Sequence, residues 1–233
     1  MLGYMSLPYL TEELAAAARD LSAEDVEQTL EKSVALCVDL IEGCDAAAVS
    51  LVRRGESIET PSSTDPRVLR GDELQYELQQ GPCMDAVWHH DIVISTDLAT
   101  DDRWPQWAPQ VVEELGVRSM MCLQLFTDAS TLGALNMYSW RPDAFSVRGD
   151  RDEGLALGAH VAVALAAAQQ VEGLNTALIS RTVIGQAEGI LMERFGINAD
   201  QAFQVLRRVS SHSNTKLLRV AVELVETRQL PPT

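Results

Sequence analysis

The chain is poor in the residues that build metal sites, disulfide frameworks and catalytic centres. Its four cysteines are scattered and form no Cys-x-x-Cys pair, which argues against a disulfide framework and the usual zinc motifs. We find no Ser/His/Asp or Cys/His arrangement, no phosphate-binding glycine loop and no paired-carboxylate motif above background. We therefore expect a protein that is not an enzyme, with no catalytic residues, no metal and no cofactor.

Long apolar runs are also missing. The longest, Gly154–Ala168, contains His160 and is too short to cross a bilayer. The N-terminal stretch MLGYMSLPYLTEE lacks a basic start, so we expect no signal peptide. With 46% hydrophobic residues, the chain is expected to be a soluble cytoplasmic protein with a core of its own and no membrane contact.

The net charge of −16 argues against a nucleic-acid partner until its distribution is considered. Residues 171–233 hold seven basic and six acidic side chains, whereas residues 1–170 hold 11 basic and 28 acidic ones. From Arg194 to Arg219 the basic residues outnumber the acidic ones by five to one. An acidic front and a locally basic back indicate two functional units.

The front part mixes helical and strand patterns. Apolar residues at helical spacing follow Val26, and residues 46–52 form an apolar run typical of a buried strand. Residues 119–126 and 131–140 alternate like two strands, joined by a hairpin at 127–130. Helices are expected at 65–78, 83–88 and 108–115. One face of the hairpin should pack on helices, and the other face, which carries polar residues, either lines a small-molecule pocket or fills a core.

From Asp150 to about Arg194 the pattern is helical without a proline. A run of this length predicts a connecting helix that pairs with a copy of itself in a homodimer. Near its end, residues 184–195 are apolar on two sides, with Glu188 near the centre of one stripe, which indicates two packing partners. The predicted dimer seam comprises Leu155, Ala159, Ala162, Leu165, Ala166, Gln169, Leu174, Ala177 and Ile184.

The C-terminal part divides into three helices. Gly196 ends the first, and Asn198 with Gln201 predicts a capping box at the start of the second. Residues 210–213 are expected to form the next turn, and Asn214 to cap the third helix. These signals predict a compact three-helix unit that grows out of the long helix.

The last 55 or so residues resemble an ANTAR domain, the RNA-binding antitermination module of bacterial regulators. The resemblance rests on the run Arg-x-x-Ile-x-x-Ala-x-Gly-Ile-Leu-Met at 181–192 and on matches across the two following helices, namely Ala202, Phe203, Leu206, Arg207, Ser210, Asn214, Lys216, Leu217, Val220 and Ala221. It implies that this unit binds stem-loops in nascent RNA. ANTAR domains commonly carry Lys where this chain has Glu188. If that Lys contacts RNA, this chain lacks one contact; the alternative, which we favour, is that Glu188 is an ion-pair partner inside the domain or at a dimer interface.

Residues 22–168 resemble the GAF domains that precede ANTAR domains in actinobacterial proteins. The matching segments are GPCMDAV, DLATDDRWPQWA, GVRSMMCLQL and LGALNMYSW. Together the two resemblances imply an α+β GAF sensor, with an antiparallel sheet flanked by helices, joined by a long helix to an all-α three-helix ANTAR domain. The expected division is an N-terminal helical extension at 1–21, GAF at 22–170 and ANTAR at 171–233.

Two groups of residues are the candidate sites. The expected RNA-binding set lies around the second inter-helix turn and consists of Arg207, Arg208, Ser210, His212, Asn214, Lys216 and Arg219. Its basic side chains and a helix N-terminus suit phosphates, while Asn, Ser and His suit exposed loop bases. The expected lining of a small-molecule pocket in the sensor is Gln124, Asn136 and Tyr138.

Three alternatives stay open from the residues. The C-terminal helices also suit a helix-turn-helix that binds DNA, or a protein-interaction module that does not bind RNA. Cys83 follows a helix start that could stabilise a thiolate, although inert packing is the commoner role. The acidic residues Asp97, Asp101 and Asp102 are expected to cap a loop rather than to hold a metal.

Overall fold

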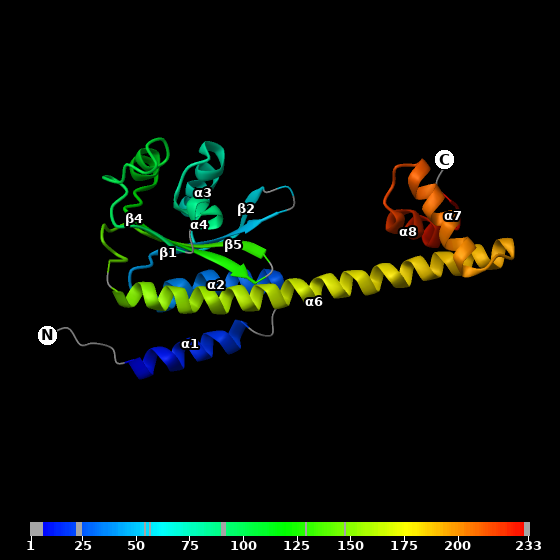
Figure 1. Ribbon diagram of the computed structural model, residues 1–233, viewed down its shortest axis with the longest axis horizontal. Coiled ribbons are helices and arrows are strands. Elements are labelled where there is room, and N and C mark those ends of the chain that lie inside the picture. Colours follow the sequence, from blue (N-terminus) through cyan, green and yellow to red (C-terminus); the bar gives the residue numbers. More distant parts are fainter. Residues whose placement is uncertain are drawn as a thin grey trace. The chain divides into compact units, whose positions relative to one another are not determined.

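The computed structural model describes residues 7–21, 25–53, 55, 57–89, 92–128, 130–146 and 148–230. The chain divides into two compact units, residues 1–169 and 170–233. Unit 1 combines a sheet with helices, and unit 2 is entirely helical within its described residues (Figure 1). The expected α+β domain, long helix and helical C-terminal domain are all present.

Unit 1 is built on a five-stranded sheet in the order β2-β1-β5-β4-β3, in which every neighbouring pair is antiparallel. The strands are β1 (Ala46–Val52), β2 (Ile58–Ser63), β3 (Ile92–Ser95), β4 (Ser119–Thr127) and β5 (Ser130–Ser139). The predicted hairpin is confirmed as β4 and β5, with Met121 opposite Met137 and Leu123 opposite Leu135.

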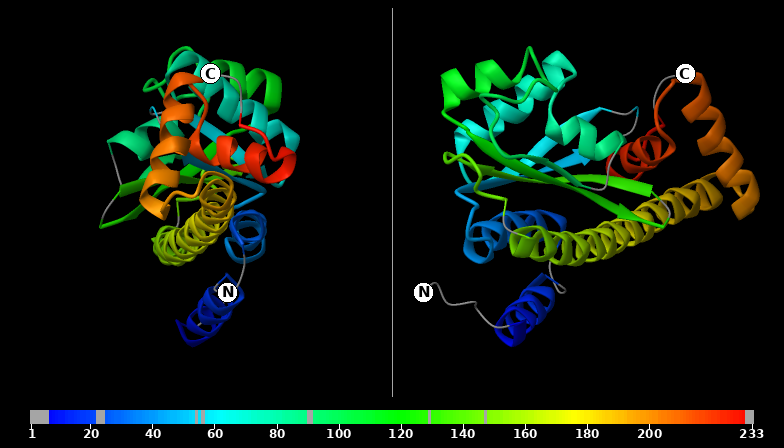
Figure 2. Two further views of the ribbon diagram at one scale, coloured as in Figure 1. Left: turned by 90° about the vertical axis from the view of Figure 1, so that its right-hand side faces the viewer. Right: turned by 60° about the vertical axis from the view of Figure 1, so that its left-hand side comes forward.

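Helices cover both faces of this sheet (Figures 1 and 2). On one face lie α2 (Val26–Leu40), with α1 (Leu7–Leu21) against it, and the first part of α6 (Arg148–Phe195). On the other lie α3 (Pro66–Leu78), α4 (Pro82–Trp88), and the segment containing the short helix α5 (Ala108–Gln110) and the π-helical turn η1 (Val111–Leu115). Alternate β4 residues enter the two cores, so the sheet is a filled middle layer.

Local chemistry explains where these elements begin and why two strands approach closely. Asp25 caps α2 by accepting from the Gln28 N–H at 2.9 Å, and Asp65 caps α3 just before Pro66. At Gly133 on β5 an added Cβ would lie 1.8 Å from the Ser50 carbonyl oxygen on β1. Only glycine therefore permits this spacing of the two central strands.

The part of α6 in unit 1 corrects the predicted dimer seam. Ala162 and Leu165 were expected to face a second copy, yet both are buried in the core beneath the sheet together with Leu157 and Val161. The assignment of these two residues was wrong, because they cover the chain's own sheet; Leu155 and Ala159 of the same predicted seam are exposed. By length and composition alone α6 also passes for a membrane span, with a mean hydropathy of 1.4. Many of its apolar residues in unit 1, such as Leu157 and Val161, fill this core, whereas Val163 is exposed.

Unit 2 is a three-helix arrangement of the end of α6, α7 (Ala199–His212) and α8 (Leu217–Thr227). Its core consists of Ala187, Leu191, Ala202, Leu206, Val209, Val220, Ala221 and Leu224. The capping box at Asn198 is confirmed: its side chain accepts from the Gln201 N–H at 2.9 Å, and the Gln201 side chain accepts from the Asn198 N–H at 3.0 Å. Gly196 ends α6 with a φ of 60°.

Candidate functional sites

The α7–α8 turn carries the predicted RNA-binding residues, and its geometry corrects two local expectations. Residues 210–212 are still helical, so the turn begins later than predicted. Lys216, not Asn214, is the N-cap of α8, and no side chain caps that end. Asn214 instead has a φ of 50°. It takes the left-handed conformation that reverses the chain after α7, a role that Asn tolerates better than most residues.

Internal hydrogen bonds hold this turn. The Ser210 hydroxyl donates to the Thr215 carbonyl oxygen at 2.6 Å, and the Ser213 hydroxyl donates to the Val209 carbonyl oxygen at 2.8 Å. The His212 Nδ1 lies 2.8 Å from the Arg208 carbonyl oxygen. Ser210 is therefore a structural residue of the turn, while the exposed imidazole of His212 and the exposed side chain of Asn214 face solvent.

Positive charge gathers near this turn, and no described carboxylate forms an ion pair with it. Arg207, Arg208, Lys216 and Arg219 are all exposed. Among the described residues of unit 2, no basic side chain forms an ion pair. The structure thus brings four predicted cations to the two sides of one turn, beside a helix N-terminus that lacks a side-chain cap. This combination favours polyanion binding.

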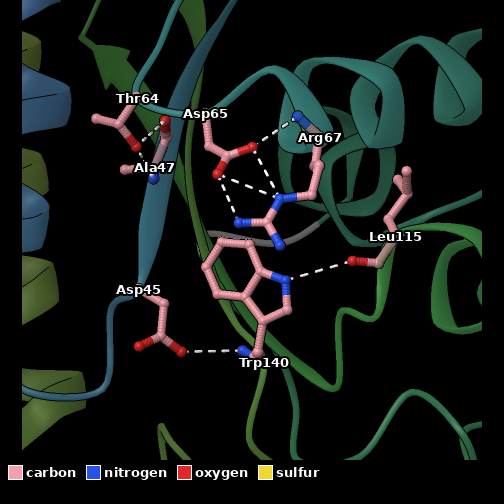
Figure 3. Close-up of polar contacts among 7 residues, drawn as sticks. All are labelled: Asp45, Ala47, Thr64, Asp65, Arg67, Leu115 and Trp140. Atoms are coloured by element: carbon pink, nitrogen blue, oxygen red, sulfur yellow. Dashed lines mark hydrogen bonds and ion pairs between the residues drawn. The ribbon is translucent and has the colours of Figure 1, made fainter.

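In unit 1, by contrast, most described arginines form ion pairs with carboxylates. The paired residues are Arg53, Arg67, Arg70, Arg103, Arg118 and Arg141. In Figure 3, Arg67 binds Asp65 through two nitrogens and lies 4.1 Å from the centre of the Trp140 ring. The Trp140 backbone N–H donates to Asp45 and its indole N–H to the Leu115 carbonyl oxygen. The contacts of Arg67 and Trp140 connect the start of α3, the end of η1 and the residues that flank β1 and β5, which is a structural role.

The acidic loop after β3 also behaves as expected. Asp97 binds the Arg118 guanidinium at 2.8 Å, and this contact lowers the pKa of Asp97. Asp101 binds Arg103 and accepts from the Ser95 hydroxyl at 2.7 Å. No cluster of three metal-ligating side chains occurs among the residues described. Asp97 and Asp101 also accept from the Ala99 N–H at 3.1 Å and the Arg103 N–H at 3.2 Å, so these two residues cap the loop.

Glu188 has no ion pair within the part of unit 2 that the structure describes, although it is half-buried. Neither Arg181 nor the two arginines of α7 contacts it. An ion pair inside the domain is therefore not formed among the described residues. Two interpretations stay open, an ion-pair partner from outside the chain and the loss of one RNA contact.

A buried polar cluster lies between β1, β5 and α3 in unit 1. Asp72 on α3 is fully buried and accepts from Thr60 at 3.0 Å, from Gln75 at 2.9 Å and from Tyr138. Asn136 adds a donor at 3.2 Å. Burial raises the pKa of Asp72 to about 6, and the donated hydrogen bonds oppose that rise. No cation contacts this carboxylate among the described residues.

The predicted pocket residues take different places. Asn136 and Tyr138 meet at Asp72 and are fully buried, and the Asn136 Oδ1 is a buried atom without a hydrogen-bond partner in the described part of the chain. Gln124 is apart from them, where its amide donates to the Val87 carbonyl oxygen at 2.8 Å. The structure therefore joins two of the three residues, and the group that joins them is a carboxylate that the strand pattern did not reveal.

A surface hollow of about 320 Å³ adjoins this cluster through Tyr76. The Tyr76 hydroxyl lies 2.7 Å from the Thr60 hydroxyl and donates to Ser50 at 2.6 Å. The other lining residues are Ser57, Ile58, Gln79, Met84 and Trp88. No spacing in the sequence indicated this hollow, because β2, α3 and α4 meet there only in the folded chain.

Cys83 is buried at the start of α4, and its thiol lies 3.4 Å from the Ser50 hydroxyl. Burial raises the pKa of this thiol to about 12. The lowered pKa that a redox-active thiolate needs is thus absent. The structure favours inert packing.

Two family models match the chain. The GAF domain model covers residues 23–166, and the ANTAR domain model covers residues 172–225. No curated protein sequence matches it.

Solved structures agree on the fold. The GAF domain of the Acinetobacter phosphoenolpyruvate-protein phosphotransferase has a TM-score of 0.55 at 14% identity over 74% of this chain and 99% of that one. Free methionine-R-sulfoxide reductase from Neisseria meningitidis has a TM-score of 0.55 at 16% sequence identity, over 73% of this chain and 98% of that one. The Stigmatella aurantiaca phytochrome photosensory core module has a TM-score of 0.59 at 13% sequence identity. The match covers 90% of this chain and 46% of the module. Identities this low carry the fold alone.

Proposed function

Because this chain belongs to the GAF domain family and carries an ANTAR domain behind its GAF domain, we propose that it is a signal-responsive transcription antiterminator of the cytoplasm. Its ANTAR domain binds stem-loops in nascent RNA, and its GAF domain controls that binding. The role is regulatory rather than enzymatic. The proposed functional units are residues 22–170 and 171–233, after the extension at 1–21.

The observation that carries the proposal is the unpaired positive charge of the α7–α8 turn. An acidic chain offers many carboxylates with which a basic side chain can form an ion pair. Solubility alone gives no reason for four neighbouring basic side chains to remain unpaired. Here Arg207, Arg208, Lys216 and Arg219 stay exposed and unpaired among the residues described, although the chain has 34 acidic residues. Phosphates of an RNA loop would release counterions from these cations and supply most of the binding free energy.

The side chains around the cations support recognition of single-stranded loop bases. His212 and Asn214 are exposed at the same turn and present a ring nitrogen and an amide. Ser210 contributes indirectly, because its hydroxyl is used to hold the turn. The short α8, of 11 residues, directs its uncapped N-terminus at the same region, which adds a site for one phosphate.

Binding assays with RNA hairpins and duplex DNA in matched salt test the proposal. We expect the chain to bind hairpins with an exposed loop and to bind duplex DNA of equal length more weakly. Tighter binding to duplex DNA would favour the helix-turn-helix alternative. Binding to neither nucleic acid would favour the protein-interaction module.

The GAF domain is the proposed sensor, and the buried cluster around Asp72 with the adjoining hollow is its proposed signal site. A small molecule is the expected signal, and Tyr76 is the group that links the hollow to the cluster. Asn136 is connected to Tyr76 through the Ser50 hydroxyl, Tyr138 lies deeper at Asp72, and Gln124 lies further along the sheet. The unbroken helix α6 contains residues of both units, which supports control through changes in this helix. A mass spectrum of small molecules released from the purified protein identifies a bound ligand directly.

The exposed face of α6 in unit 2 is the proposed homodimer interface. Every residue from 171 to 179 is exposed in the single chain. The apolar ones include Val171 and Leu174 at 57% exposure and Leu178 at 63%. A bare helix of this length is marginal in water, so a partner helix is needed to cover these side chains. Sedimentation of the full chain at micromolar concentration tests whether it is a dimer.

A further inference from the structure

The candidate dimer face on α6 contains two charges of opposite sign within an apolar stripe. Residues three and four apart form one line along the helix, and the line consists of Val171, Leu174, Leu178, Arg181, Gly185, Glu188, Met192 and Phe195. Its apolar members are exposed, with Met192 at 37% and Phe195 at 55%. This set is called the α6 stripe below.

We propose that the α6 stripes of two copies pair antiparallel, and that Arg181 and Glu188 set this orientation by forming an ion pair between the copies. The proposal rests on the dimer proposed above. It gives Glu188 a partner that its own chain does not supply in the described residues. The partner is a second copy of this chain.

Parallel pairing in register would place like charges opposite each other. In a parallel pair each stripe residue faces its own copy, so Arg181 would face Arg181 and Glu188 would face Glu188. The nearest opposite charge would be seven residues away, or about 10.5 Å along the helix. Residues that flank the stripe offer no compensation, because they are Asn175, Ala177, Thr182, Ile184, Gly189 and Leu191.

Antiparallel pairing of the two stripes brings opposite charges together instead of like charges. With Val171 opposite Phe195 of the second copy, Leu174 lies opposite Met192 and Arg181 opposite Gly185 of that copy. Glu188 of the second copy is then three residues, about 4.5 Å, along the axis from Arg181, within reach of its guanidinium. By symmetry two such pairs form, flanked on both sides by apolar layers that shield them from water.

Gly185 fits this arrangement for a reason of its own. A Cβ at Gly185 would meet nothing within 4 Å in the single chain, so the chain's own packing does not require glycine there. A glycine inside a helix destabilises it by about 1 kcal/mol relative to alanine. Placed opposite an arginine of the second copy, the missing side chain leaves room for the guanidinium.

Charge reversal separates this ion pair from general packing. Arg181→Glu alone and Glu188→Arg alone should each raise the dimer dissociation constant about tenfold or more, since each converts two attractions into two repulsions. The double variant Arg181→Glu/Glu188→Arg should restore wild-type dimerisation. Glu193→Arg, an exposed change outside the stripe, is the matched control. Failure of the double variant to recover would overturn the ion pair.

Disulfide trapping reads the orientation directly, and the native cysteines do not interfere because all four are buried. Leu174→Cys and Met192→Cys variants of the full chain are oxidised separately and after mixing and subunit exchange, with Glu193→Cys as the control for random collisions. We expect a covalent dimer only in the mixture, because residue 174 lies opposite residue 192 of the second copy. Cross-linking of Leu174→Cys with itself would overturn the antiparallel arrangement, and a sedimenting dimer without any cross-link would overturn the stripe. A monomer in sedimentation would instead refute the underlying dimer.

Discussion

Asp72 is the residue whose environment departs furthest from what its type suggests. It lies on a helix whose exposed residues are largely polar, yet its carboxylate is buried among donors from β2, β5 and its own helix. Charged Asp is rarely buried without a cation, and the donated hydrogen bonds only partly replace water. Burial therefore raises its pKa to about 6.

This pKa predicts how stability changes with pH. Because the pKa of Asp72 is higher in the folded chain than the ordinary value of 3.8, the folded state holds the proton more tightly. The contribution of Asp72 to the free energy of unfolding should fall as pH rises from about 4 to about 6, by about 3 kcal/mol in total, and then stay level. Urea unfolding followed by tryptophan fluorescence reports on unit 1, which contains all four tryptophans.

The comparison that isolates this effect is Asp72→Asn against the wild type. Paired carboxylates such as Asp97, whose pKa is lowered by Arg118, change stability in the opposite direction over the acidic range, so only the difference between the proteins is diagnostic. Asp152→Asn, an exposed change on α6, is the control. An unchanged pH profile in Asp72→Asn would show that the carboxylate is not the titrating group.

Asn214 shows how one residue type supports two readings of a turn. Asn before an apolar helix is a good N-cap signal, and it is equally the residue that enters the left-handed region most readily after glycine. Asn214 lies three residues before Leu217, the first residue of α8, so the sequence allows either role. The observed φ of 50° assigns Asn214 to the second role and leaves α8 without a side-chain cap.

Serine substitutions distinguish these roles, because serine caps helices well but is strained in the left-handed region. Asn198→Ser should keep the stability of α7 within a few tenths of a kcal/mol, whereas Asn214→Ser should destabilise unit 2 by about 1 kcal/mol. Asn214→Gly should be tolerated. Hydrogen exchange of α7 and α8 peptides by mass spectrometry measures these local effects. Full tolerance of Asn214→Ser would contradict the assigned conformation.

Among the elements, helix α6 shows what apolar periodicity can and cannot predict. It predicts the helix, but not which of its faces is buried by the chain itself. The sequence predicted its length and its two apolar sides, and residues such as Leu157 and Ala187 fill the cores of units 1 and 2 respectively. The pattern did not reveal which side meets the chain itself, because an apolar stripe is the same whether it covers a sheet or a second copy. Only the position of the sheet decides that Ala162 and Leu165 point inward.

Two charged substitutions on α6 should therefore have different effects. Ala162→Glu places a carboxylate in the core beneath the sheet, and we expect it to unfold or strongly destabilise unit 1, by about 3 kcal/mol or more. Leu178→Glu changes an exposed side chain and should dissociate the dimer without destabilising unit 1. Thermal unfolding by tryptophan fluorescence and sedimentation measure the two outcomes. A folded monomer from Ala162→Glu would restore the original seam.

The candidate sites were predictable to different degrees for the same physical reason. The basic residues of the α7–α8 turn are close in sequence, so local spacing placed them correctly around one turn. The Asp72 cluster gathers residues from Ser50 to Tyr138. Contacts over such separations depend on strand pairing and helix placement, which no local pattern encodes. Asn136 and Tyr138 were found through strand alternation, and their partners on α3 were not.

At the scale of the whole molecule, the chain separates its charges by domain. Unit 1 pairs most of its described arginines with its own carboxylates, and unit 2 leaves its cations unpaired among the residues described. A protein of net charge −16 repels polyanions at long range, so RNA binding must be short-ranged and confined to the basic turn. RNA binding by this chain therefore depends on the unpaired cations of that turn.

The most direct test is the salt dependence of hairpin binding by the wild type and by an Arg207→Ala/Arg208→Ala/Lys216→Ala variant. If two or three phosphates are neutralised per domain, log K for the wild type should fall with log salt at a slope of about −0.7 per contact. The triple variant should bind at least about a hundredfold more weakly, with a nearly flat slope. Arg70→Ala in unit 1 serves as the control for net charge, and circular dichroism verifies the fold. Unchanged affinity and slope in a folded triple variant would contradict RNA binding by this turn.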